Sequence, residues 1–418
     1  MYENDEFQLP IYFINEKNKL NQNIIDDLEL LSVKEIDNIS IKEVDNTSEN
    51  NTLENNTLEN NTSRASLLET IYKPNTIIEK NHLHKLCEYT TTNKLFLKDT
   101  QKLVSKLKYK HFNDYNDSYD KVYNTWTDIK KDINFIDKYY YIDVSYFKFL
   151  NNSSLFLQLL SLYSLLSPVL SLILPIIMLI VPFFVLKFKG LPITIESYYT
   201  FLVTMISKHA LGNILVIMQD IPWEKRVYGV ISILFYFFSI YQNSLICYRF
   251  LNNFYDIHEK IFLLRDYLDH TINNINTLEQ NITTYKSYDP FIQKNNEYKN
   301  KFILLKENLD KIIPLSLNNV TSKVSQIGLI MKYFYEFHEN NNINILMEYS
   351  FGLNAYIKYI KTVNQQCREK SLNKCNFGKT LSLNNMYYPY LTKNDSICND
   401  VKLNKNIIIT GPNASGKT

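Results

Sequence analysis

The sequence is poor in glycine and cysteine, and its charges nearly cancel. Only eight of its 418 residues are glycine, which disfavours turn-rich all-β folds. The five cysteines are odd in number and form no C-x-x-C pair, so we expect a reducing compartment and neither a disulfide scaffold nor a cysteine zinc site. The 45 Lys and Arg residues balance 43 Asp and Glu residues, so composition argues neither for nor against nucleic-acid binding.

The N-terminal part lacks a secretory signal and contains a low-complexity stretch. Residues 1–37 begin with acidic residues rather than with a basic and then apolar run, and we expect them to form a mobile segment. Residues 38–66 include three copies of Glu-Asn-Asn-Thr and predict a disordered linker, because they bury too little apolar surface to offset the entropy of ordering. We interpret the Asn-x-Thr triplets as low complexity rather than as glycosylation sites. Order should resume near Leu67, in a helical soluble segment over residues 67–148.

Two long charge-free stretches predict a membrane region over residues 149–250. The apolar run Leu155–Leu186 would extend about 48 Å as one helix, which is too long for an untilted single pass. Three prolines in this run predict a kink, a re-entrant segment or a hairpin: Pro168, Pro175 and Pro182. Val227–Tyr248 has an ordinary spanning length, and Tyr198–Met218 is a weaker candidate. The alternative for the two charge-free stretches is a buried core helix, which we disfavour because soluble helices rarely exclude charge for so long. The weaker candidate carries Lys208 and His209, so its alternatives are an interfacial or a re-entrant position.

Residues 251–380 predict long helices that form a lever and a core. Apolar residues recur at three- and four-residue steps and form one stripe: Phe250, Phe254, Ile257, Ile261, Leu264 and Leu268. Asp289-Pro290 should interrupt the helices until about Phe302, and Pro314 should interrupt them again. Four aromatic residues near the end of this region are interpreted as core rather than as a surface that stacks on bases: Tyr333, Phe334, Tyr335 and Phe337.

The segment 381–418 ends in a phosphate-binding loop. Its last eight residues match G-x-x-x-x-G-K-[ST] without a mismatch: Gly411, Pro412, Asn413, Ala414, Ser415, Gly416, Lys417 and Thr418. The β-branched run Ile407–Ile409 before them predicts a buried parallel strand. The glycines let amide N–H groups turn inward around an anion, Lys417 offers a charge to the β- and γ-phosphates, and the Thr418 hydroxyl would coordinate Mg²⁺. ATP and magnesium are the expected ligands.

Around this loop the sequence resembles the MutS family of DNA mismatch-repair ATPases. Thr410-Gly411-Pro412-Asn413-x-x-Gly416-Lys417 is similar to the family's T-G-P-N-x-x-G-K-S-T, and Asn399–Leu403 resembles its N-D-[IV]-x-L element. Tyr388–Leu391 stands where the family has H-P-L-L, and the helical residues 346–363 resemble the helices that lead into the ATPase domain. The specific likeness covers residues 346–418.

The resemblance implies an ATP-dependent DNA-binding protein of the mismatch-repair or recombination type, which forms homodimers through its ATPase domains. Because that domain must face ATP, we expect about two spans with both soluble ends on the cytosolic or nucleoplasmic side. No Phe-x-Glu wedge, which the family's mismatch readers carry, occurs in residues 1–150, and the later matches at Phe334 and Phe337 are interpreted as coincidence. We expect residues 1–418 alone to hydrolyse ATP only at background rate, since the family's acidic strand should follow Thr418.

The alternative function is a transporter-like or membrane-remodelling P-loop ATPase that does not bind DNA. Exporters also place a phosphate loop after membrane helices, although they usually need about six spans.

The remaining groups that could carry chemistry are weak candidates. His82, His84 and Cys87 could suggest a metal cluster, but we interpret them as ordinary helix surface because no further ligands lie nearby. Cys367 and Cys375 lack a partner pair, so a zinc site there is not expected. The expected fold is thus mainly α, with transmembrane helices and a long helical core before the first strand of an α/β P-loop domain.

Overall fold

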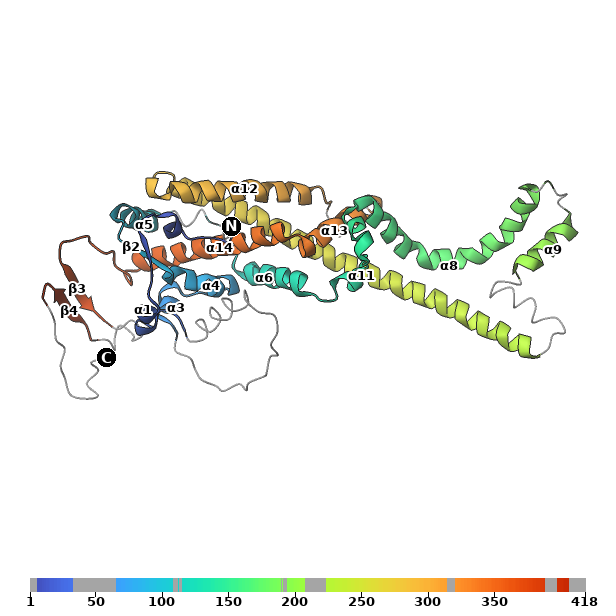
Figure 1. The fold of residues 1–418 in the computed structure, drawn as a ribbon, viewed down its shortest axis with the longest axis horizontal. Helices are drawn as coiled ribbons and strands as arrows, with labels where there is room; N and C mark the ends of the chain where they lie inside the picture. The colour runs from blue at the N-terminus through green and yellow to red at the C-terminus, as the bar shows by residue number, and fades with distance from the viewer. Residues whose placement is uncertain are drawn as a thin grey trace. The chain divides into compact units, whose positions relative to one another are not determined.

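The computed structural model describes residues 6–32, 65–107, 112, 115–188, 190, 194–206, 223–313, 320–387 and 397–405. These residues are mostly helical, with two short two-stranded sheets (Figure 1). They form two compact units that interleave along the chain. One contains Met1–Asn124, Leu268–Leu304 and Asn344–Thr418, and the other contains Thr125–Tyr267 and Leu305–Ile343. The predicted phosphate-loop residues, 411–418, lie outside the described parts of the chain.

The first unit combines short elements, most of them near the N-terminus, with parts of long helices. Its short elements are η1 (Pro10–Phe13), β1 (Lys17–Lys19), α1 (Gln22–Asp27), α3 (Leu67–Tyr72), α4 (Ile77–His82), η2 (Leu83–Cys87), β2 (Tyr89–Thr91), α5 (Lys94–Lys106), η5 (Lys286–Tyr288), β3 (Leu381–Met386) and β4 (Asn399–Leu403). The elements wholly inside the second unit are α7 (Phe135–Lys138), η4 (Ser145–Asn152), α8 (Ser154–Phe188), α9 (Ile195–Ile206) and α13 (Val320–Glu339). Four helices contribute residues to both: α6 (Asn116–Lys131), α11 (Trp223–Ile282), α12 (Asp289–Asp310) and α14 (Asn341–Arg368).

The prediction of a mobile N-terminal segment is wrong for residues 6–32. Phe7 is only 2% exposed, and its ring meets that of Tyr349 edge-on at 5.3 Å. Gly352 of α14 permits this close approach, because a Cβ at that position would lie 2.6 Å from the Phe7 Cβ. Strand β1 pairs antiparallel with β2, about 70 residues later, and this pairing also fixes the segment. Burial of its few apolar side chains, rather than its overall polarity, decides its structure.

Order resumes at the position that the sequence predicts. Ser66 and Glu69 form a reciprocal capping box, in which the Ser66 Oγ accepts from the Glu69 N–H at 3.2 Å and the Ser66 N–H donates to the Glu69 carboxylate at 2.7 Å. Helix α3 therefore begins at Leu67. The predicted linker residues 38–64 lie outside the described part of the chain.

The helix break near residue 289 is confirmed, but its position differs from the prediction. Helix α11 ends at Ile282, and α12 begins at Asp289 rather than near Phe302. Pro290 occupies the first turn of α12, where an N–H has no partner within the helix and a proline is tolerated. The same residue that would end a helix from within therefore helps to start one.

Two helices, α8 and α11, are long and apolar enough to cross a membrane by length and composition. Helix α8 continues through its three prolines, so within the described residues the first apolar run is a single helix, which curves along its length in Figure 1. Helix α11 continues without a break from the second apolar stretch into the predicted lever. Of the third candidate, only α9 is described.

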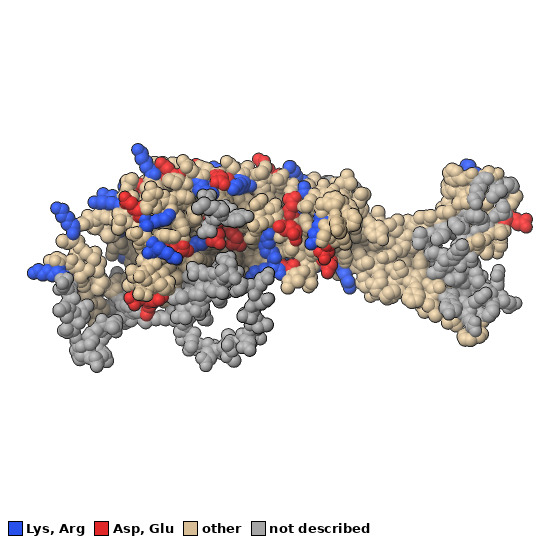
Figure 2. Space-filling model, viewed as in Figure 1, with Lys and Arg blue, Asp and Glu red and all other residues tan. Residues whose placement is uncertain are grey.

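The apolar side chains of these helices face outward. Leu159 is 58% exposed, and Leu234 and Phe235 on α11 are 63% and 67% exposed. On the face drawn in Figure 2, the surface of this part of α8 and α11 shows no Lys, Arg, Asp or Glu. A soluble core helix would bury these side chains, so the interpretation of α8 and α11 as core helices does not fit their exposure.

Helix α13 packs closely on the start of α8 through Gly328. The Gln158 side chain of α8 donates to the Val324 carbonyl at 2.6 Å and accepts from the Gly328 N–H at 2.9 Å. A Cβ at Gly328 would overlap the Ser154 carbonyl oxygen and would lie 2.5 Å from the Gln158 backbone nitrogen. Because both are main-chain atoms, neither can yield by a change of rotamer.

We expect Gly328→Ala to destabilise the protein by about 1–3 kcal/mol, the usual cost of overpacking. At an exposed helical position the same change would stabilise the protein by about 1 kcal/mol. The sign of the stability change therefore distinguishes a tightly packed glycine from an exposed one. Thermal unfolding of the detergent-solubilised protein measures the effect. Gly378→Ala is the matched control, since the nearest atom to its added Cβ lies 3.6 Å away. An unchanged or raised midpoint for Gly328→Ala would contradict the packing described above.

Candidate functional site

The eight predicted nucleotide-binding residues, from Gly411 to Thr418, lie outside the described residues. The same holds for the predicted strand Ile407–Ile409 and for Tyr388–Leu391. The structure does describe the segment that precedes the predicted loop in the chain, which comprises β3, β4 and residues 404–405.

Strand β4 coincides with the element that resembles the MutS N-D-[IV]-x-L motif. It pairs antiparallel with β3, with Leu381 opposite Leu403 and Leu383 opposite Val401. The Asp400 carboxylate accepts a hydrogen bond from the Asn385 N–H at 2.7 Å. Asn385 has a φ of 53°, a left-handed conformation that asparagine tolerates better than most residues, and it lies where the register of the ladder shifts. Asp400 therefore fixes the irregular part of the hairpin.

The four aromatic residues on α13 are buried, which confirms the prediction that they belong to the core. Phe334 and Phe337 are 0% and 1% exposed. Phe334 packs against Phe135 with ring centroids 5.1 Å apart, and Phe337 meets Trp126 edge-on at 5.9 Å. Neither phenylalanine can reach a nucleic-acid base from this position, so the two Phe-x-Glu matches are not wedges.

The candidate metal ligands around residue 84 do not converge. The His82 Nδ1 lies 2.8 Å from the Ile78 carbonyl one turn earlier, and the Cys87 thiol donates to the His84 carbonyl at 3.0 Å. Cys87 is buried in the apolar core rather than on the surface, unlike the prediction. Within the described residues, no group of three His, Cys, Asp or Glu side chains could hold a metal ion.

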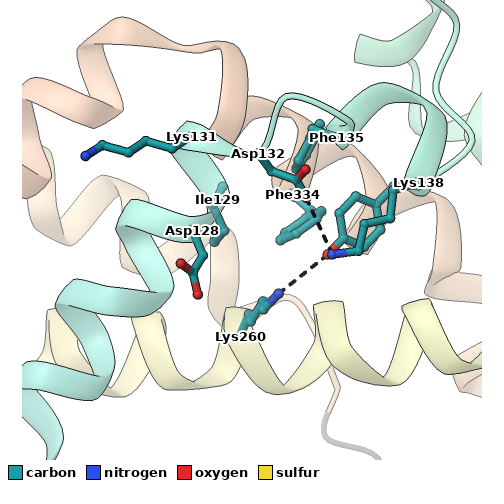
Figure 3. Close-up of a pocket in the computed structure, with 9 residues that line it drawn as sticks. Asp128, Ile129, Lys131, Asp132, Phe135, Lys138, Lys260 and Phe334 are labelled. Atoms are coloured by element: carbon teal, nitrogen blue, oxygen red, sulfur yellow. Dashed lines mark hydrogen bonds and ion pairs between the residues drawn. The ribbon is translucent and has the colours of Figure 1, made fainter. Parts of the chain in front are cut away.

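A charged hollow of about 330 Å³ opens in the second unit, between α6, α7, α11 and α13 (Figure 3). The Lys260 ammonium pairs with the Asp256 carboxylate at 2.7 Å, and the Tyr139 hydroxyl donates to the same carboxylate at 3.1 Å. Lys138 pairs with Asp132 at 3.4 Å, whereas Lys131 points away from the hollow in Figure 3. Burial and the neighbouring Asp256 raise the pKa of Tyr139. Carboxylates thus balance the lysines, and the hollow does not favour a bound anion.

A buried polar cluster in the first unit joins α6, α11 and α14. The His270 Nε2 lies 2.7 Å from the Tyr119 hydroxyl and 2.9 Å from the Asn274 amide nitrogen. Asn274 also donates to the Asn354 carbonyl oxygen at 2.8 Å, and the Asn354 amide donates to the Thr271 hydroxyl at 3.0 Å. These contacts satisfy polar groups that would be costly to bury alone, and they fix the register of the helices. Sequence analysis missed this cluster; the only signal was polar residues within apolar stripes.

Comparison with known proteins assigns neither a family nor a function to this chain. No family model, no curated protein and no solved structure matches the chain.

Glu88, which lies four residues after His84, is an acid whose ionisation opposes folding. Burial, reinforced by the carboxylate of Glu6, raises the pKa of Glu88 to about 7. The His84 imidazole lies 3.8 Å from the Glu88 carboxylate, beyond hydrogen-bonding distance, and does not offset the burial. Since the pKa is higher in the folded than in the unfolded state, stability falls as the pH rises from about 4.5 to about 7.

We expect Glu88→Gln to remove this pH dependence. The variant should be more stable than the parent at pH 8, by about 1–2 kcal/mol once water screening of the partly exposed carboxylate is allowed for, and should match it near pH 4.5. Thermal unfolding at the two pH values measures the difference. Glu16→Gln, at an exposed glutamate in the same unit, is the control. An equal gain for Glu88→Gln at both pH values would show that the carboxylate is not the cause.

Proposed function

We propose that this protein is a MutS-like ATP-binding protein held at a membrane. The observation that carries the proposal is the complete phosphate-loop sequence at 411–418, directly after a β-branched run. Strand β4, which ends at Leu403, adds support because the resembled element adopts the extended conformation expected on the approach to such a loop. In this proposal, the amide groups between Gly411 and Gly416 surround the phosphates, Lys417 neutralises charge on them, and Thr418 holds Mg²⁺.

Exposed apolar helices support the membrane part of the proposal. A helix pairs most of its backbone groups internally, as a lipid environment requires, and the carbonyl of Ser171, four residues before Pro175 and its missing N–H, finds its donor on α11. Polar side chains also link α8 and α11 within the charge-free region: the Tyr236 hydroxyl donates to the Ser171 carbonyl at 2.9 Å, and the Asn243 amide donates to the Ser171 hydroxyl at 2.5 Å. Such interhelical hydrogen bonds between small and polar residues stabilise helix pairs in membranes. The pair would therefore insert as a hairpin.

DNA binding and dimerisation through the ATPase domains rest on the resemblance alone. On the face drawn in Figure 2, Lys and Arg are interspersed with Asp and Glu over the described helices rather than gathered into one basic patch. The second candidate is a membrane-remodelling or transporter-like ATPase that does not bind DNA. The continuity of α11 favours this candidate, because no linker separates its apolar residues from the helical core.

We expect Lys417→Ala to abolish most nucleotide binding. Loss of a charge-assisted hydrogen bond to phosphate costs about 1.5–3 kcal/mol, which corresponds to about a 10- to 100-fold weaker affinity. The measurement is retention of labelled ATP by the natural protein, purified in detergent with Mg²⁺. Lys405→Ala removes an exposed lysine of the same charge from the described loop after β4 and serves as control. Equal retention by both variants would end the assignment of this loop.

The salt dependence of DNA binding separates the two candidate functions. A DNA-binding ATPase should lose affinity steeply between low and physiological salt, since each phosphate contact releases a counterion. A remodelling ATPase should show no binding even at low salt. Fluorescence anisotropy of labelled duplexes, measured on the detergent-purified natural protein with and without ATP, distinguishes the outcomes. Binding that does not change with salt would support neither candidate.

A further inference from the structure

A short segment before α8 exposes several large apolar side chains next to one another. In η4 and the residue before it, Tyr146 is 88% exposed, Phe149 66%, Val144 56% and Phe147 53%. Single exposed apolar residues are ordinary on protein surfaces, but four within six residues form a contiguous patch. Such a patch in water carries an unfavourable free energy that needs an explanation.

The segment is fixed in place, so this exposure does not come from a frayed loop. On one side, the fully buried Tyr141 hydroxyl donates to the Met331 carbonyl of α13 at 2.7 Å. On the other, Asn151, which is 0% exposed, donates to the Ile142 carbonyl at 2.8 Å and accepts from the Ile142 N–H at 3.0 Å. Both ends of the segment are thus hydrogen-bonded, and the aromatic rings between them are presented outward by a defined backbone.

The segment lies at one end of the charge-free part of α8 and α11. Only Ser153 separates η4 from α8. On the other helix, the Tyr140 ring lies 6.5 Å from the Phe250 ring, and the Asn253 amide donates to the Lys138 carbonyl at 2.6 Å. Phe250 comes two residues after Tyr248, where the charge-free stretch of α11 ends. Tyr248 itself is 64% exposed.

A second set of aromatic residues marks the opposite end of this stretch. Trp223 at the start of α11 is 73% exposed, and Phe188 at the end of α8 is 89% exposed. The 25 helical steps from Trp223 to Tyr248 span about 38 Å at about 1.5 Å each. This length exceeds the hydrocarbon core of about 30 Å and falls just short of the whole bilayer with its headgroups, about 40–45 Å. Aromatic residues at this spacing are typical of the two membrane–water interfaces.

We propose that η4 lies in the headgroup layer of a phospholipid bilayer, with Tyr146, Phe147 and Phe149 inserted at the boundary with the acyl chains. The proposal rests on the membrane part of the proposed function. It identifies lipid as the occupant because η4 leads within two residues into α8, whose Leu155 and Leu159 are 70% and 58% exposed. Lys148, paired with Asp143 at 3.2 Å, keeps a polar side on the same segment, as expected for an interfacial element.

Depth-dependent fluorescence quenching tests the proposal. The background variant is Trp223→Phe, which leaves Trp126 buried at 2% exposure as the only other tryptophan. Three single substitutions are added in turn: Tyr146→Trp in η4, Leu170→Trp in the middle of α8, and Leu304→Trp on the exposed face of α12. Each protein is reconstituted in phosphatidylcholine vesicles that carry a spin-labelled lipid, with the label either near the glycerol or deep in the acyl chain.

We expect the shallow label to quench the fluorescence of Tyr146→Trp more strongly than the deep label does. The deep label should quench Leu170→Trp more strongly than the shallow label does. Neither label should quench Leu304→Trp. Quenching of Leu170→Trp but not of Tyr146→Trp would overturn the inference while leaving the membrane spans intact. Stronger quenching of Tyr146→Trp by the deep label, or a blue-shifted but unquenched emission that indicates a protein cover, would also overturn it. If neither variant is quenched, the membrane part of the proposed function fails.

Discussion

Exclusion of charge from long stretches of α8 and α11 is the constraint on which the rest of the structure depends. Water cannot solvate the outward-facing side chains of α8 and α11 without a large free-energy cost, about 25 cal/mol for each Å² of apolar surface. Most backbone groups of a helix are paired within it, and the Ser171 carbonyl that Pro175 leaves without a donor accepts from Tyr236, so these segments tolerate an apolar solvent that would not accept a loop or a sheet edge. Polar side chains within this region, such as Ser171 and Asn243, bond to the neighbouring helix rather than to solvent. The proposed membrane location accounts for this arrangement, because lipid would cover the outward-facing apolar side chains of the pair.

Helix α11 changes its environment along its length without changing its conformation. Up to Tyr248 it exposes apolar residues in several directions. From Phe250 onward the same helix carries a single buried stripe, with Phe254, Ile261 and Leu264 each at most 5% exposed. This stripe was predicted from its three- and four-residue spacing, and the outer positions become polar. A helix that is apolar all round and then amphipathic is the expected pattern for a segment that leaves a membrane and joins a protein core.

The parts of the fold that the sequence predicted correctly depend on local pattern. Helix periodicity, the capping box at Ser66 and Glu69, the burial of Phe334 and the charge-free stretches can all be recognised within a few neighbouring residues. The failures depend on distant contacts. Nothing near Phe7 indicates that it packs against Tyr349, and nothing near His270 indicates that the Tyr119 hydroxyl contacts its ring nitrogen. For the candidate site, the sequence predicts the loop residues by type, while the geometry of such a loop depends on main-chain angles that composition does not specify.

The polar cluster of the first unit has a consequence for how a nucleotide could act on this protein. Helix α14 ends at Arg368, and β3, the first strand before the predicted phosphate loop, begins 13 residues later in the chain. Asn354 of α14 bonds to Asn274 and Thr271 of α11 in a buried environment. A shift of α14 along its axis would break these bonds and leave buried polar groups without partners, which costs about 1–3 kcal/mol for each group. The cluster therefore resists gradual sliding and favours discrete arrangements, so under the proposed function a nucleotide-driven motion of α14 would have to move this part of α11 with it or break the cluster outright.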